Sequence, residues 1–131
     1  MIQKIDHIGI AVSDLEEALK LYRDTLGLHV EATEEFEGMK IAFIPIGDTE
    51  FELLQPMDTG GALAKFIEKR GEGVQHIALQ VDDVEKSLEE LKAKGLRVID
   101  EKPRPGAGGA RIAFFHPKST MGVLLEICQR G

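Results

Sequence analysis

Two histidines stand at matching positions of two similar segments, and they are the residues of this chain best suited to chemistry. His7 lies in IDHIGIAV and His76 in VQHIALQV, and an acidic helix start follows each apolar stretch. An internal repeat of this kind is typical of tandem modules. A buried imidazole needs partners for both ring nitrogens, and a metal ion together with a hydrogen-bond acceptor supplies them. The repeat therefore predicts a metal site that draws one histidine from each module.

Two glutamates form a second repeated pair. Glu52 lies in EFELL and Glu126 in VLLEIC, the last expected strand of each module. Apolar residues surround Glu126, so its carboxylate must be paired, protonated or bound to a cation. An ungapped alignment of MKIAF with ARIAF places Gln55 opposite Glu126, whereas a longer hairpin in the second module restores Glu52. We prefer Glu52, because Gln55 precedes Pro56 at a strand end.

Two imidazoles and two carboxylates make a borderline-to-hard set of ligands, which suits Co²⁺, Ni²⁺, Zn²⁺ or Mn²⁺. Water or substrate would fill the open positions. A metal held in this way acts as a Lewis acid on a carbonyl oxygen and stabilises an enolate. The predicted ligands are His7, Glu52, His76 and Glu126.

Other reactive side chains are interpreted as structural. Cys128 is the single cysteine and lies in an apolar run, which predicts a packed thiol. We interpret His116, in HPK, as a turn residue, and His29, which has no repeat partner, as a surface residue. The glycines of KPRPGAGGA predict a flexible loop. Three basic residues near it could meet a phosphate or carboxylate: Arg104, Arg111 and Lys118.

The hydrophobic pattern predicts the same order of elements twice. The first module is predicted to contain a strand over 4–12, a helix over 14–26, and strands over 28–36, 39–46 and 50–56. A short helix over 61–70 follows. The second module is predicted to contain a strand over 74–81, a helix over 83–94, and strands over 96–100, 111–117 and 122–128.

This order predicts an α+β fold, in which tandem βαβββ modules form a bowl-shaped, barrel-like mixed sheet around the metal site. We expect a single domain over residues 1–131. Module 1 covers about 1–57, a linker helix lies at about 58–73, and module 2 covers about 74–131.

Composition excludes several classes of protein. The chain has 131 residues, of which 43% are hydrophobic, enough for the core of one domain. A net charge of −7 without a basic stripe argues against a nucleic-acid partner. No apolar run reaches the roughly 20 residues of a membrane span, and the start lacks the layout of a signal peptide. We therefore expect a cytoplasmic protein that binds a small molecule and no membrane.

The motifs above are similar to those of the vicinal oxygen chelate superfamily, also called the glyoxalase/bleomycin resistance/dioxygenase superfamily. The resemblance covers essentially the whole chain, and within the superfamily it is strongest to the methylmalonyl-CoA epimerase family. IDHIGIAV, EGVQHIAL and GAGGARIAFFHPKSTMGVLLEI resemble that family's two histidine strands, glycine loop, HPK turn and terminal glutamate strand. HPK followed by GVLLE is the most specific element.

The resemblance implies an enzyme, an isomerase that interconverts the 2R and 2S forms of methylmalonyl-CoA. It would remove and return the C2 proton through a metal-stabilised enediolate. His7, Glu52, His76 and Glu126 fall on the family's metal positions, with Co²⁺ as the first choice of ion. Glu126 is also the candidate catalytic acid/base. The resemblance further implies an acyl-CoA substrate and a homodimer.

The second acid/base of such a reaction stays unassigned. A proton transfer that inverts a carbon needs a group on each face of it. Some relatives carry a glutamate three residues after the glycine that enters the third strand, and counting from Gly38 gives Ile41. Nearby candidates are Glu35, Glu37 and Lys40.

Two other functions remain open. A glyoxalase I-like lactoylglutathione lyase can use the same ligand set, so the ligands do not separate it from an epimerase. A non-catalytic binding protein of the superfamily would keep the fold and lose the metal. A dioxygenase is disfavoured, because an iron oxygenase needs two histidines, one carboxylate and open sites for oxygen.

Overall fold

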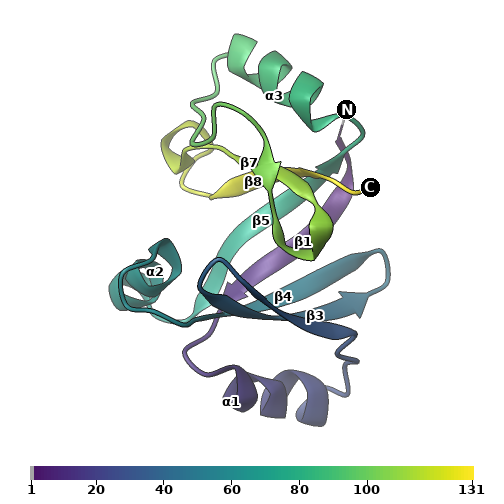
Figure 1. The fold of residues 1–131 in the computed structure, drawn as a ribbon, viewed down its shortest axis with the longest axis vertical. Coiled ribbons are helices and arrows are strands. Elements are labelled where there is room, and N and C mark those ends of the chain that lie inside the picture. Colours follow the sequence, from purple (N-terminus) through teal and green to yellow (C-terminus); the bar gives the residue numbers. More distant parts are fainter. Residues whose placement is uncertain (1) are drawn as a thin grey trace. The chain divides into compact units, whose positions relative to one another are not determined.

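The structure is a computed structural model and describes residues 2–131 (Figure 1). The first part of the chain contains β1 (Ile2–Ala11), α1 (Leu15–Leu19), a π-helix (Lys20–Thr25), β2 (Ala32–Phe36), β3 (Met39–Ile46), β4 (Thr49–Pro56) and α2 (Ala62–Arg70). The second part contains β5 (Gly73–Val81), α3 (Val84–Ala93), β6 (Arg104–Pro105), β7 (Arg111–Phe114) and β8 (Leu125–Gln129), with 3-10 turns at Ala107–Gly109 and Pro117–Ser119.

These elements form two units, and strand β1 contributes to both. The first unit is His7–Gln75, and the second unit combines the residues up to Asp6 with His76–Gly131. The strand order is β2-β3-β4-β1 in the first unit and β1-β5-β8-β7-β6 in the second. The β1–β4 and β5–β8 pairs are parallel, whereas β3 and β7 are antiparallel to both of their neighbours. The predicted α+β class, with the βαβββ order repeated, is confirmed.

In the first unit, helix α1 covers one face of the sheet. Leu15 and Leu19 of α1 pack with Ala42, Ile44 and Leu53 of β3 and β4. We call this the helix face of the unit. Consecutive residues of a strand point to alternate sides of a sheet. The strand residues that alternate with Ala42, Ile44 and Leu53 therefore point away from α1, to what we call the opposite face.

The second unit repeats this arrangement with helix α3 (Figure 1). Val84 and Leu88 of α3 pack with Ala113, Phe115 and Ile127 on its helix face. Its opposite face carries a separate buried cluster that includes Ala78, Ile112 and Cys128. Burial of each large apolar side chain contributes about 1.5 to 3 kcal/mol. The two helices therefore determine which way each strand of their unit faces.

Both helices are fastened to the last strand of their own module by a glutamine. The Leu15 N–H donates to Gln55 Oε1 over 2.7 Å, and the Val84 N–H donates to Gln129 Oε1 over 2.9 Å. These N–H groups belong to the first turn, where no helical carbonyl is available to accept from them. Each module thus sets its helix start against its last strand by the same bond.

The predicted strand over 96–100 is wrong. Only Val98 forms an isolated bridge, to Phe115, and the paired strand β6 instead lies at Arg104–Pro105. The reason is the side chain of Asp100, whose Oδ2 accepts from the Phe114 N–H over 2.8 Å. A carboxylate thus takes the place that a backbone carbonyl would hold in a regular ladder. No helix among residues 2–131 has the length and apolar character needed to cross a bilayer.

The glycine loop is packed tightly at Gly106. A Cβ at this position would lie 2.7 Å from Cγ2 of Ile112, a buried side chain on the opposite face of the second unit. Isoleucine is branched at Cβ and has little freedom to rotate away. The absence of a side chain at Gly106 is therefore required by packing.

We predict that Gly106→Ala lowers the free energy of unfolding by about 1 to 3 kcal/mol, the usual cost of overpacking. Gly60→Ala is the control, because a Cβ there meets nothing within 4 Å. Urea denaturation followed by circular dichroism measures both. Equal stability of the two variants would contradict the packing argument.

Candidate metal and acid/base site

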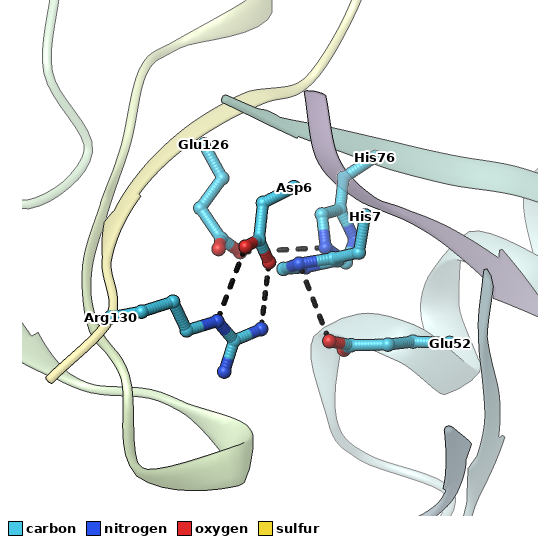
Figure 2. A network of polar contacts seen from close by, with 6 residues as sticks. All are labelled: Asp6, His7, Glu52, His76, Glu126 and Arg130. Atoms are coloured by element: carbon cyan, nitrogen blue, oxygen red, sulfur yellow. Dashed lines mark hydrogen bonds and ion pairs between the residues drawn. The ribbon is translucent and has the colours of Figure 1, made fainter. Parts of the chain in front are cut away.

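In the first unit, His7 and Glu52 lie together. Nδ1 of His7 is 3.3 Å from Oε2 of Glu52, and both side chains are buried (Figure 2). The parallel register of β1 and β4 places Gly9 opposite Glu52. Because Gly9 has no side chain, the imidazole of His7, two residues earlier on the same face, reaches the carboxylate diagonally.

In the second unit, His76 and Glu126 lie together in a similar way, although through the other ring nitrogen. Nε2 of His76 is 3.4 Å from Oε1 of Glu126, and both residues are buried (Figure 2). Here Ala78 is opposite Glu126 in the parallel register of β5 and β8. A small residue again stands where a large one would block the histidine. Each unit therefore brings one predicted histidine and one predicted glutamate together on its opposite face.

The glutamine bonds to the helix starts favour Glu52 over Gln55 as the partner of Glu126 in the repeat. Gln55 bonds to the start of α1 as Gln129 bonds to the start of α3. This equivalence pairs Gln55 with Gln129, and therefore pairs Glu52 with Glu126, three residues earlier in each strand. The side chain of Gln55 accepts a hydrogen bond from the first turn of α1, whereas the side chain of Glu52 contacts His7.

The second unit also contains a partly buried ion pair that the sequence did not indicate. Arg130 donates through Nη2 and Nε to the two carboxylate oxygens of Asp6, over 2.7 and 3.2 Å (Figure 2). Asp6 is 7% exposed. A two-point pair of this kind orients both groups as well as attracting them. It joins the middle of β1 to Arg130, near the end of the chain.

A row of contacts lies against the ring of His76. Phe114 packs edge-on against the imidazole, with ring centroids 5.4 Å apart. The guanidinium of Arg104 lies 5.6 Å from the centre of the Phe114 ring, and Arg104 Nε donates to Asp100 over 2.9 Å. These contacts restrict the orientation of His76. The basic residue of the glycine loop thus belongs to the surroundings of this histidine.

The other residues considered in the sequence have structural positions. His116 caps the turn Pro117–Ser119, where its Nδ1 accepts from the Lys118 N–H over 3.1 Å. His29 is exposed. Cys128 is fully buried, as predicted.

The second acid/base is absent from the expected position. Ile41 is 1% exposed and apolar, and it stands opposite Leu54 in the sheet. The nearby candidates Glu35, Glu37 and Lys40 are all exposed. The alternation of strand β3 places Lys40 on the same face as Ala42, the helix face.

Residues 6–114 match the family model described as the Glyoxalase/Bleomycin resistance protein/Dioxygenase superfamily. The chain belongs to this superfamily. It is 39% identical to the ethylmalonyl-CoA/methylmalonyl-CoA epimerase of Cereibacter sphaeroides, over 98% of this chain and 99% of that protein. It is 35% identical to the human mitochondrial methylmalonyl-CoA epimerase, over 96% of this chain and 73% of that protein.

A solved structure gives the same likeness in three dimensions. The methylmalonyl-CoA epimerase of Streptomyces coelicolor, as a variant in complex with 2-nitronate-propionyl-CoA, superposes with a TM-score of 0.97 at 39% identity. The match covers 100% of this chain and 96% of that one.

We predict that Cys128 is inert in the folded protein. Burial raises the pKa of its thiol well above the ordinary value, and the nearby carboxylates of Asp6 and Glu126 raise it further. Since the thiolate is the reactive form, a disulfide reagent at pH 8 should react only as the protein unfolds. Following the reaction with and without denaturant measures this. Rapid stoichiometric labelling of the folded protein would contradict it.

Proposed function

We propose that this protein is an enzyme that interconverts the 2R and 2S forms of methylmalonyl-CoA. The support is that relatives bearing this activity in their names match nearly the whole chain at 33 to 39% identity. Solved epimerases, one of them bound to methylmalonyl-CoA itself, share its fold closely. We propose an acyl-CoA as its substrate.

We further propose that His7, Glu52, His76 and Glu126 together hold one divalent metal ion. The observation that carries this is the spacing within each His–Glu pair, 3.3 Å in the first unit and 3.4 Å in the second. A charge-assisted hydrogen bond is shorter, about 2.7 to 2.9 Å. Two ligand atoms that each lie about 2.1 Å from a common ion are about 3.0 to 3.4 Å apart. The donors therefore fit an ion, and their chemistry suits Co²⁺ first, with Ni²⁺, Zn²⁺ or Mn²⁺ as alternatives.

The ion, when bound, supplies a Lewis acid for the substrate's thioester and carboxylate oxygens. The residues of the chain prepare the site for it. Burial of both glutamates to 3% exposure keeps water from their carboxylates. The ring of Phe114 restricts His76. Glu126 is the residue to which we assign proton transfer at C2.

Three broader features complete the proposal. The two modules, at about 1–57 and 74–131 with the linker helix at 58–73, would act as one domain in which a bowl-shaped sheet surrounds the ion. The continuity of β1 through both units supports this. We also propose a cytoplasmic homodimer. Ile2 and Ile5, 51% and 44% exposed at the start of β1, are apolar surface of the kind that interfaces cover.

We predict that Glu126→Ala lowers metal-dependent turnover at least about 100-fold, since it removes both a ligand and an acid/base group. The far-UV circular dichroism spectrum should not change. Glu90→Ala, on the exposed side of α3, is the control and should keep full activity. Metal content of the purified proteins should fall only in the first variant. Full activity of Glu126→Ala would mean that the site is assigned wrongly.

We predict that the wild-type protein, with Co²⁺ added, exchanges the C2 proton of methylmalonyl-CoA for deuterium in D₂O. Removal of the metal by a chelator should abolish the exchange, and its return should restore it. Mass spectrometry of the thioester measures the label. Turnover of methylglyoxal and glutathione without exchange would indicate a lactoylglutathione lyase instead. Ligand binding without bound metal or turnover would indicate a binding protein.

A further inference from the structure

The proposed reaction requires two groups that carry protons, one for each face of C2. A single group can remove a proton and return it to the same face, but this leaves the configuration unchanged. Inversion requires that a different acid delivers the proton from the other side. Glu126 provides one group in the function proposed above, and the inference that follows rests on that function.

The register of the first unit places two further carboxylates on its opposite face, those of Glu34 and Glu50. Glu34 of β2 stands directly across from Ile41 of β3. Phe43, two residues along β3, stands across from Glu52 of β4. Side chains that face each other across a ladder, or that lie two residues apart on a strand, share one face of the sheet. Glu34 is therefore on the same face as Glu52 and its partner His7.

The neighbouring acidic residues do not share this position. Glu35 is paired with Lys40, so both point to the helix face, and both are exposed. Glu37 lies in the turn between β2 and β3 and is exposed, with a backbone φ of 47°. Glu34, in contrast, is half-buried. Glu50 is half-buried as well, but it stands across from Pro45, on the other side of Glu52 from Ile41. Glu34 is the half-buried carboxylate on this face that stands beside Ile41.

The spacing of the strands puts Glu34 within working distance of the pair. Glu34 and Glu52 are two strands and two residues apart, which corresponds to about 12 Å between their Cα atoms in a flat sheet. A glutamate side chain extends about 5 Å from Cα to its carboxylate oxygens. Side chains of Glu34 and Glu52 that lean toward each other together span most of this distance, so a substrate carbon held between them comes within reach of the Glu34 carboxylate.

The residue at the corresponding position of the second unit cannot accept a proton. There Arg104 stands across from Ile112, as Glu34 stands across from Ile41. The guanidinium of Arg104 is engaged by Asp100 and by the ring of Phe114, and it carries no proton acceptor. At this position the two modules carry residues of opposite charge, Glu34 and Arg104.

We propose that Glu34 is the second catalytic acid/base of this protein. It stands beside Ile41 of the neighbouring strand, which has no ionisable group to serve as the base. In one direction, the Glu34 carboxylate takes the C2 proton and becomes a carboxylic acid. The electron pair of the broken C–H bond becomes part of the C=C bond of the substrate enediolate. The carboxylic acid of Glu126 then donates its proton to the other face of C2, forming the new C–H bond. Exchange with solvent restores both groups.

The test uses Glu34→Gln, which keeps the shape of the side chain and removes the base. Racemic methylmalonyl-CoA carrying deuterium at C2 is incubated in H₂O with the Co²⁺-loaded protein. The wild-type protein should wash out all of the label. The variant should lose epimerisation at least about 100-fold. Its wash-out should stop at about half of the label, because Glu126 still exchanges one epimer. Glu34→Asp should restore part of the epimerisation.

Glu35→Gln is the matched control, since it changes the adjacent glutamate on the other face and should behave as wild type. Metal content and thermal midpoint should be equal in all the variants, which separates a catalytic effect from a loss of fold or ion. If Glu34→Gln epimerises within about threefold of the wild type, Glu34 is not the second base, although the proposed function stands. If the wild-type protein neither epimerises nor exchanges, the proposed function itself fails, and the role of Glu34 with it.

Discussion

The structure depends on the alternation of side chains along its strands, because each sheet is covered by a helix on one face only. In the first unit, α1 packs against Ala42, Ile44 and Leu53, so the residues that alternate with them must point to the opposite face. In the second unit, α3 takes Ala113 and Ile127 in the same manner. Shifting a strand by one residue would bury glutamates under the helices and expose the core. The apolar packing of the helix faces therefore also determines where the polar pairs lie.

Burying a glutamate and a histidine together is unfavourable unless their polar atoms gain partners. The sequence meets this constraint in the same way twice. A small residue, Gly9 or Ala78, stands across from the glutamate and admits the imidazole. Gln55 and Gln129 then hold the strands against the helix starts. Such bonds would help to hold the ligands of the proposed metal site in place, since ligands must be held within fractions of an ångström.

The two modules match at the proposed metal ligands and differ at the position of the proposed second acid/base. Ile41 corresponds to Ile112 and Phe43 to Phe114, so the walls beside the two glutamates match. Across from the isoleucines, however, Glu34 corresponds to Arg104. Binding one ion can use the symmetry of a repeat. Proton transfer to and from a single carbon cannot, because the two faces of that carbon differ.

The sequence by itself determined the order of the elements, the repeat and the pairs of chemically able residues. These follow from local patterns: the period of apolar residues, the acidic helix starts and the matching histidine strands. It predicted the α+β fold and the candidate residues His7, Glu52, His76 and Glu126, of which the structure joins the members of each unit. The prediction of a strand over 96–100 was wrong because the side chain of Asp100 replaces a backbone carbonyl in the ladder. The local pattern of apolar residues does not reveal such a replacement.

Only the tertiary structure decided which neighbours each residue has across the sheet. The choice between Glu52 and Gln55 depends on a bond between Gln55 and a helix forty residues earlier. The pairing of Asp6 with Arg130 joins the two ends of the chain. The position of Glu34 beside Ile41 depends on the register of β2 and β3. Register and long-range hydrogen bonds result from the packing of the whole unit. The sequence pattern therefore predicts which residues form a site, but not how they are arranged.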